Sequence, residues 1–225
     1  RAEPNPAHIS LARLNDMGLL QAVITQNIDG LHQASGVPDE KIVELHGNTC
    51  RIRCMSCRKI SAIDGVQQRL SGGDRVPECD CGGFLKPDTI SFGQAMPVAE
   101  VEKSVTLSSQ CDFFLVVGST LVVQPAAQMP VYAKNNGAFL AIVNLSETPC
   151  DSMCDVLIRE KAGNVLQQII KEVENLMKRN IEMQSRKDES CLVHNLPRFL
   201  STLHTLCRLP LDRETPSFWL WSGVW

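Results

Sequence analysis

A group of polar side chains follows directly after a short β-prone run near the start of the chain. The run Val-Ile-Thr at residues 23–25 leads into Gln26, Asn27 and Asp29. An amide beside a carboxylate provides both hydrogen-bond donors and acceptors, and these groups match a carboxamide ligand. Asn-x-Asp-Gly is also favourable turn chemistry, so the same residues could cap the turn that follows. The two interpretations are compatible, and both place the group at the end of a strand.

His46, within the stretch Glu-Leu-His-Gly-Asn at residues 44–48, is a second candidate for chemistry. Imidazole titrates near neutral pH, so a histidine can take a proton from a hydroxyl group whose oxygen then becomes a nucleophile. Single histidines are more often structural. The residue type alone therefore leaves both interpretations open.

Four of the ten cysteines form two close pairs, Cys54 with Cys57 and Cys79 with Cys81. Two such pairs can place four thiolates around one Zn²⁺ at about 2.3 Å, and with all four positions filled the metal would be structural. The second pair is C-x-C, where C-x-x-C is usual, so Cys50 is an alternative fourth ligand. The ten cysteines are not spaced like a disulfide framework, which predicts an intracellular, reducing compartment.

Apolar segments alternate with amphipathic ones along the chain, and this pattern predicts the elements that must position these residues. We expect strands over residues 20–25, 41–48, 111–120, 138–146 and 155–160. We expect helices between Asn5 and Gly18, over 63–70, after Pro125 and over 162–179. Strands that are apolar throughout and alternate with helices predict a parallel sheet covered on both faces.

Ligands bind such sheets outside the carboxyl ends of the strands. Three of the expected strands end in polar sequences there: Gln26–Asp29, Gly118-Ser119-Thr120 and Asn144. Gly118-Ser119-Thr120 could be a plain turn from strand to helix, although both hydroxyl groups can donate and accept hydrogen bonds. The sequence therefore places its candidate chemistry at one edge of the predicted sheet.

No strand of this sequence leads into G-x-G-x-x-G or another glycine-rich loop that could hold a pyrophosphate. We therefore expect an α/β, Rossmann-like parallel sheet that is incomplete, with its first βα unit missing. The first residue is Arg1 rather than Met, which also favours a fragment. We expect a discontinuous Rossmann-like domain formed by residues 1–48 and 86–180. A zinc module is inserted at 49–85, and a tail of unknown structure follows at 181–225.

The tail has an unusual composition, because all three tryptophans of the chain fall in its last seven residues, at positions 219, 221 and 225. We assign it no role. The whole chain is 44% hydrophobic with a formal net charge of −3 and a pI near 6.0. This balance gives no electrostatic reason to expect a nucleic-acid or membrane surface. The segment 51–59 is locally basic but lacks the interleaved aromatic residues of a nucleic-acid-binding module.

Taken together, the motifs resemble those of the sirtuins, the NAD-dependent protein-lysine deacylases. The resemblance covers about residues 3–178 and rests on a set of motifs in the family's order. They are TQNIDGLH, ELHGN, the two cysteine pairs, GFLKPDTISFGQ, VVGSTLVVQPAA and IVNLS. The chain departs from the family pattern in the order of Ser119 and Thr120, in the C-x-C pair, and in Gln94, where many relatives carry Glu.

The resemblance implies a role for each matching residue. His46 would be the general base, and the substrate peptide would add as a strand beside Ser91, Phe92 and Gly93. NAD would be bound by Gln26, Asn27, Ile28, Asp29, Gly118, Ser119, Thr120, Asn144 and, near the adenine, Ala162. One structural Zn²⁺ would be bound by Cys54, Cys57, Cys79 and Cys81.

The implied reaction begins when the acyl-lysine carbonyl oxygen attacks C1′ of the nicotinamide ribose and nicotinamide leaves. His46 then activates a ribose hydroxyl, and the products are free lysine, nicotinamide and O-acyl-ADP-ribose. The partner would be an acylated protein or peptide, with no nucleic acid and no membrane. An alternative is a catalytically inactive, zinc-stabilised interaction protein, and the isolated chain is expected to bind NAD poorly because it lacks the glycine-rich loop.

Overall fold

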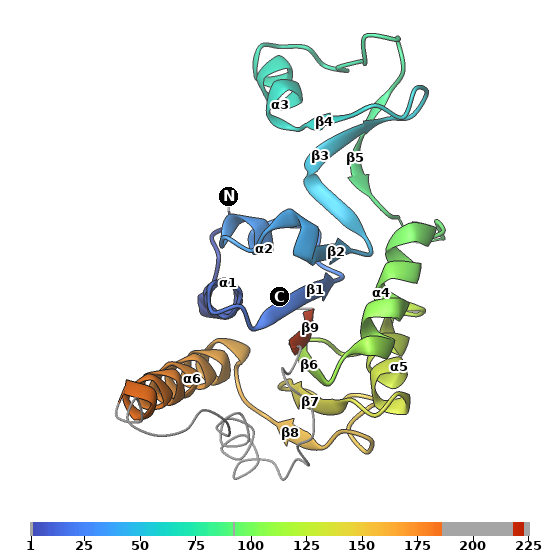
Figure 1. Ribbon diagram of the computed structural model, residues 1–225. Helices are drawn as coiled ribbons and strands as arrows, with labels where there is room; N and C mark the ends of the chain where they lie inside the picture. The colour runs from blue at the N-terminus through green and yellow to red at the C-terminus, as the bar shows by residue number, and fades with distance from the viewer. Residues whose placement is uncertain (1, 92, 186–217, 223–225) are drawn as a thin grey trace.

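The computed structural model describes residues 2–91, 93–185 and 218–222, with side chains described up to residue 180. Its main feature is a six-stranded, fully parallel sheet with the strand order β2-β1-β9-β6-β7-β8 (Figure 1). The strands, in that order, are Ile42–Glu44, Leu20–Thr25, Phe218–Ser222, Phe113–Val117, Phe139–Val143 and Val156–Ile158. The predicted α/β class with a parallel sheet is therefore confirmed.

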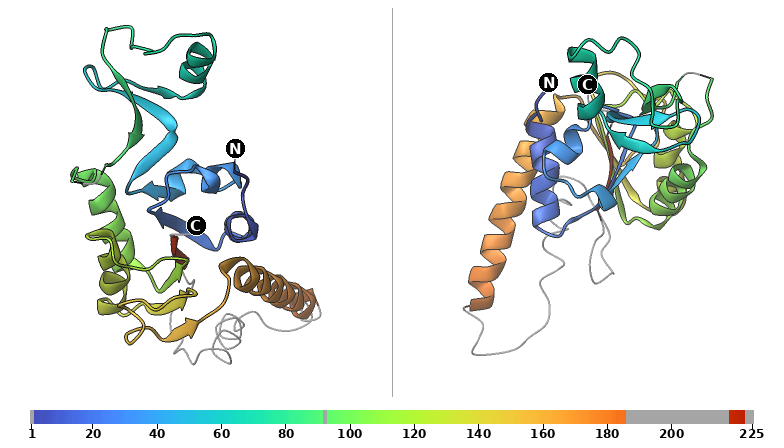
Figure 2. Two further views of the ribbon diagram at one scale, coloured as in Figure 1. Left: turned by 180° about the vertical axis from the view of Figure 1, so that it is seen from behind. Right: turned by 90° about the horizontal axis from the view of Figure 1, so that it is seen from above.

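Helices cover both faces of this sheet, as the view from above shows (Figure 2). Helices α1 and α6 lie on one side, and α4 and α5 lie on the other. The described helices are α1 (Pro6–Asp16), α2 (Leu31–Ala34), η1 (Asp39–Lys41), α3 (Asp64–Ser71), α4 (Val98–Gln110), η2 (Ala126–Gln128), α5 (Met129–Asn135) and α6 (Ala162–Ser185). Among them, no helix combines the length and apolar character needed to cross a membrane.

The buried residues of β6 and β7 alternate between two cores, which is why these two strands are apolar throughout. Leu115 and Val117 of β6 join the core under α1 and α6, whereas Phe114 and Val116 join the core under α4 and α5. Side chains on a strand alternate between the two faces of a sheet, so a sheet buried on both faces requires apolar residues at every position.

A second, antiparallel sheet extends away from the large one, in the order β4-β3-β5 (Figure 1). Its strands are Ile60–Ala62, Gly47–Cys54 and Leu85–Thr89. Of the four paired cysteines, Cys54 ends β3 and Cys57 lies in the turn after it. Cys79 and Cys81 lie in the segment between α3 and β5. The hairpin strands were not predicted, because their short, mixed sequences lack a clear alternation of polar and apolar residues.

Most predicted elements are confirmed, with shifted boundaries. Asn5 caps α1, and its side-chain oxygen accepts hydrogen bonds from the backbone N–H groups of Ala7 and His8, at 2.9 and 3.2 Å. The expected strand 41–48 is wrong in extent: β2 ends at Glu44, and His46 lies in the turn before β3. Helix α4 was not predicted.

The C-terminal region differs most from the sequence prediction. Helix α6 continues six residues beyond the expected end at 179, and residues 218–222 form the strand β9 between β1 and β6. The tail therefore supplies a central strand to a sheet that was expected to be incomplete. A sequence pattern does not show where a short apolar run pairs when the pairing partners are distant in the chain.

A buried histidine pair links α1 to α2. The rings of His8 and His32 have centroids 4.8 Å apart, and both side chains are almost completely buried. Burial, with a smaller contribution from the neighbouring His8, lowers the pKa of His32 from 6.5 to about 3, and burial also lowers the pKa of His8. Folding therefore requires His32 to stay neutral.

We expect this pair to make stability depend on pH below neutrality. In the unfolded chain His32 takes up a proton near pH 6.5, whereas in the folded chain it does so only near pH 3, so stability falls as pH decreases between these values. The loss approaches about 1.4 kcal/mol per pH unit for one such group. Urea unfolding between pH 7.5 and 5.0 should show a shallower dependence in His32→Gln than in the native chain. Equal slopes would contradict the assignment.

Candidate active site and zinc centre

The carboxyl ends of the parallel strands bring the predicted polar residues to one edge of the large sheet. Thr25, at the end of β1, and Val117, at the end of β6, both align with Ser222 of β9 in the strand register. Gln26 follows Thr25, and Gly118 follows Val117. Candidate residues that lie 92 positions apart in sequence therefore reach the same edge of the sheet, on either side of β9.

His46 contacts the first of these polar groups directly. Its Nδ1 lies 3.1 Å from the backbone carbonyl oxygen of Gln26. A carbonyl oxygen can only accept a hydrogen bond, so Nδ1 must carry the proton. The other ring nitrogen, Nε2, is then the one that can accept a proton, as a general base requires. The half-buried imidazole thus has a defined tautomer and orientation.

Gly47 allows the chain after His46 to pack directly against β5. A Cβ atom at this position would lie 2.0 Å from the carbonyl oxygen of Asp88, and the φ of Gly47 is +74°. On the other side of the turn, the backbone N–H of Ile90 donates to the carbonyl oxygen of His46 at 2.9 Å. Only glycine fits such a close approach, so the small residue fixes His46 against the segment that leads to Ser91.

The loop after β1 is held by its own hydrogen bonds. Asp29 Oδ1 accepts from the backbone N–H of Leu31 at 3.0 Å at the start of α2, and the backbone N–H of Asn27 donates to Thr25 Oγ1 at 3.0 Å. The carbonyl oxygen of Ile28 accepts from the backbone and the hydroxyl of Thr49. The capping interpretation of Asp29 is therefore observed, while its second carboxylate oxygen projects from an exposed residue.

The polar residues after β6 and β7 also lie at this edge. Gly118 has a φ of +59°, and its backbone N–H donates to the carbonyl oxygen of Val143 at 2.9 Å. Ser119 is buried, and its hydroxyl accepts from the backbone N–H of Leu121 at 3.3 Å, whereas Thr120 is exposed. These contacts shape a tight turn directly above the carboxyl end of β6.

Asn144 follows β7 and is buried, and its amide donates to the carbonyl oxygen and the hydroxyl of Ser146, at 2.9 and 3.1 Å. Arg159 donates to the carbonyl oxygens of Asn144 and Ser146 and pairs with Asp151. Ala162 is the first residue of α6 and is half-buried. The Arg159 contacts were not foreseen, because a single arginine in a loop carries no spacing signal.

The predicted peptide-binding segment forms a short turn at the end of β5. Gln94 Oε1 accepts from the backbone N–H of Ser91 at 3.3 Å, and the backbone N–H of Gln94 donates to the carbonyl oxygen of Ser91 at 3.0 Å. Ser91 and Gly93 are exposed, and Phe92 lies outside the described residues. A cavity of about 460 Å³ has Gln94 and Gly47 in its wall, and His46 does not line it.

A polar network around Glu44, on the other side of His46 in sequence from Asn48, was not predicted. Asn48 is buried; its Nδ2 donates to Glu44 Oε1 at 2.5 Å, and its Oδ1 accepts from the backbone N–H of Cys50 at 2.7 Å. Arg51 pairs with Glu44 at 2.5 Å and with Asp88 at 3.3 Å. The only sequence signal for this network was Asn48, the polar residue that follows His46-Gly47.

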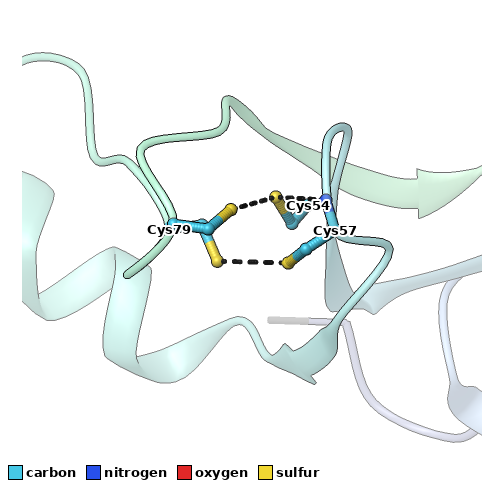
Figure 3. Close-up of side chains that lie close together, drawn as sticks. Cys54, Cys57 and Cys79 are labelled. Atoms are coloured by element: carbon cyan, nitrogen blue, oxygen red, sulfur yellow. Dashed lines mark hydrogen bonds between the residues drawn. The ribbon is translucent and has the colours of Figure 1, made fainter.

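Four cysteine sulfurs converge in the smaller sheet. Each thiol of the group Cys54, Cys57, Cys79 and Cys81 has its sulfur within 4.8 Å of the other three. Cys54 and Cys81 sulfurs are 3.6 Å apart, and those of Cys57 and Cys79 are 3.7 Å apart (Figure 3). Four sulfurs at about 2.3 Å from one ion form a tetrahedron with edges of about 3.8 Å, so the residues fit Zn²⁺.

The surrounding backbone favours a thiolate at Cys54. The N–H of Cys57 points at the Cys54 sulfur at 3.5 Å and is the main reason that the pKa of the Cys54 thiol is lowered to about 6. Gly83 leaves room for the site, because a Cβ there would lie 2.7 Å from the Cys54 sulfur. The short C-x-C pair therefore does reach the cluster, whereas the Cys50 sulfur lies 3.7 Å from the carbonyl oxygen of Asp29 instead.

The comparisons with known proteins agree with this geometry. The family model described as Sir2 family matches residues 1–125. The NAD-dependent protein deacetylase of Sulfolobus acidocaldarius is 42% identical over 175 residues, covering 78% of this chain and 68% of the relative. NAD-dependent protein deacetylase 1 of Bradyrhizobium diazoefficiens is 46% identical over 166 residues, covering 73% and 65%. The match thus spans about two thirds of the length of these relatives.

Solved structures give the same result. A structure described as "Sir2 bound to acetylated peptide" superposes with a TM-score of 0.72 at 38% identity, covering 77% of this chain and 72% of that one. Another, described as "Sir2-p53 peptide-NAD+", gives a TM-score of 0.71 at 38% identity, covering 77% and 71%. The chain belongs to the Sir2 family of NAD-dependent protein deacylases, the sirtuins, as the sequence motifs predicted.

We expect the zinc content to depend on Cys81 and not on Cys50. Cys81→Ser removes a sulfur 3.6 Å from that of Cys54 and leaves three thiolates, whereas Cys50→Ser changes a thiol outside the cluster. Metal analysis of the purified chain should give about one zinc for the native protein and for Cys50→Ser, and much less for Cys81→Ser. If Cys50→Ser loses zinc and Cys81→Ser retains it, Cys50 is the fourth ligand and Cys81 is not.

A second prediction concerns the close approach at Gly47, with Gly18 as a matched control. Both glycines have φ near +70°, but a Cβ at Gly18 would meet nothing within 4 Å, whereas one at Gly47 would meet the Asp88 carbonyl. Gly18→Ala should cost about 1–2 kcal/mol of stability from backbone strain alone. Gly47→Ala should cost clearly more in urea unfolding. Equal losses would show that the contact with β5 is not tight.

Proposed function

We propose that this chain forms the catalytic core of an NAD-dependent protein-lysine deacylase in which His46 is the general base. The observation that carries the proposal is the hydrogen bond between His46 Nδ1 and the Gln26 carbonyl oxygen at 3.1 Å. It leaves Nε2 able to accept a proton at the carboxyl edge of the sheet, where doubly wound folds bind their ligands. The names of the relatives support the same activity.

In this proposal NAD is a co-substrate that supplies the ribose carbon to which the acyl oxygen is transferred. His46 takes the proton from a ribose hydroxyl, and Gln26 holds the imidazole in the tautomer that can do so. Asn27 and Asp29 bind the nicotinamide carboxamide, with Ile28 beside them. Bound NAD and peptide would have to exclude water from these residues, because the reacting ribose carbon would otherwise be hydrolysed.

Further contacts to NAD are assigned to the second half of the edge. Gly118, Ser119 and Thr120 would contact the cofactor from the turn after β6, Asn144 its adenosine ribose, and Ala162 its adenine. The placement of all five at the carboxyl side of β6, β7 and the start of α6 supports the assignment. Because Ser119 and Asn144 already use polar atoms within the protein, binding would proceed through their remaining donors and acceptors.

The proposed substrate is an acylated lysine in an extended peptide. Among related structures, one is described as bound to an acetylated peptide and another to a propionylated peptide. We propose that such a peptide adds as a strand beside Ser91 and Gly93, which are exposed shortly after β5, and beside Phe92, which lies outside the described residues.

The zinc centre has a structural role in this proposal, because four thiolates leave no position for a substrate. It stabilises a module at 49–85 inserted into the NAD-binding domain formed by 1–48 and 86–180. The arginines of the module support this role over nucleic-acid binding, since Arg51 and Arg53 pair with carboxylates. The free thiolates that zinc requires support our proposal of a reducing, intracellular compartment.

Replacing His46 tests the proposal. Both His46→Ala and His46→Gln should lower NAD-dependent deacylation of an acetyl-lysine peptide by at least about 10²-fold, the usual contribution of a general base. Gln can still donate to the Gln26 carbonyl, so its failure would separate proton transfer from positioning. Mass spectrometry of nicotinamide and O-acyl-ADP-ribose, at saturating NAD, measures the reaction in this chain and in the full-length enzyme that contains it.

Unchanged zinc content and unfolding midpoint would serve as controls for the His46 variants. Turnover by His46→Ala at the native rate would contradict the role of the imidazole. It would leave the family membership in place and make another group the base.

We expect the 225-residue chain itself to bind NAD weakly. No G-x-G-x-x-G loop occurs in its sequence, so the helix-terminal amide groups that usually hold a pyrophosphate are missing. Calorimetric titration should give a dissociation constant above about 1 mM, at the weak end of the range for enzyme substrates. Micromolar binding with ordinary turnover would show that another segment supplies these contacts.

A further inference from the structure

The strand β9, from the C-terminal end of the chain, fills the position between β1 and β6. We call this position the slot. β9 pairs in parallel with β1 from Leu20↔Phe218 to Thr25↔Ser222, and with β6 from Phe113↔Phe218 to Val117↔Ser222. β1 and β6 are each hydrogen-bonded to β9, which lies between them in the sheet (Figure 1). The two halves of the sheet are therefore joined by β9 backbone hydrogen bonds.

The position of β9 has a specific meaning in a doubly wound sheet. The usual order of such a sheet is 3-2-1-4-5-6, in which the first strand of the fold is central and the order of the strands reverses beside it. The observed order is β2-β1-β9-β6-β7-β8, so β9 holds the place of strand 1, although it is the last strand along this chain.

The sequence of this segment suits a central strand. Residues 216–225, Pro-Ser-Phe-Trp-Leu-Trp-Ser-Gly-Val-Trp, carry no charge, and the strand itself is apolar except for its last residue. Strands covered on both faces have such continuous apolar sequences. Three tryptophans gathered in seven residues would be costly in a segment exposed to water. The catalytic assignment leaves this composition unexplained, whereas a central strand at residues 218–222 is consistent with it.

The slot also connects the two halves of the candidate site. Gln26 follows the strand on one side of β9, and Gly118 follows the strand on the other side. Ser222 is aligned with the last residue of each neighbour. Without a strand in the slot, β1 and β6 would each present a row of unpaired backbone donors and acceptors, which is costly and prone to wrong pairing.

We propose that the chain's own C-terminal segment, Phe218–Ser222, acts as a surrogate first strand that completes the sheet in cis and holds the two halves of the site in register. It completes the sheet without bringing a glycine-rich loop. The slot should therefore accept any apolar segment that can pair in parallel with both β1 and β6. This property is independent of the proposed deacylase activity.

The test uses the full 225-residue chain and a proline in the middle of β9. Proline cannot donate to the ladder and is excluded from central strands, so Leu220→Pro should empty the slot, whereas Leu220→Val should keep it filled. Hydrogen–deuterium exchange of residues 20–25 and 113–117 should become at least about 10-fold faster in Leu220→Pro, while β3 and β5 keep their protection. Native exchange in Leu220→Pro would overturn the proposal.

A synthetic peptide of residues 214–225 provides the second measurement, and it remains decisive even if Leu220→Pro loses protection throughout. The peptide should bind the Leu220→Pro chain, restore protection of β1 and β6, and bind the native chain far more weakly because the slot is occupied. A peptide carrying the same proline is the control. Failure of the native peptide to restore protection would overturn the proposal. A native chain that is a dimer in solution would also overturn it, because the strand would then come from a second copy.

Discussion

Parallel hydrogen bonding of the large sheet is the constraint on which the rest of the structure depends. When all strands run in one direction, every strand ends at the same edge, and whatever follows the strands is brought together there. Gln26 and Gly118 are distant in sequence, yet both follow strands aligned with Ser222. Burial of the strands between two layers of helices makes this arrangement stable, because β1, β2, β6 and β7 each contribute apolar residues to both cores.

His46 reaches that edge through a different kind of constraint. It lies in a turn between two strands that belong to different sheets, and its orientation is set by the Gln26 carbonyl on one side and by β5 on the other. Gly47 makes the second contact possible because a larger residue would collide with Asp88. The four cysteines lie at the far end of β3 and β5, where a bound zinc ion would hold these strands together and so fix the small sheet at both ends.

Local patterns predicted the elements that have strong local signals. The cap at Asn5, the apolar strands and the amphipathic helix after Ala162 are each encoded within about a dozen residues, and all are present. The zinc ligands were predicted because thiolate pairs have few other uses at that spacing, and the cluster includes the unusual C-x-C. The small-sheet hairpin and α4 were missed because their sequences are short or mixed in character.

The sequence by itself determined the family, the parallel sheet, the cysteine ligands and the identity of the polar residues, because each depends on residue types at short, regular spacing. Only the tertiary structure decided which nitrogen of His46 carries the proton, that Asn48 and Arg51 both bind Glu44, and that the C-terminal strand lies at the centre of the sheet. These features depend on contacts between segments far apart along the chain, and such contacts exist only once both cores are packed.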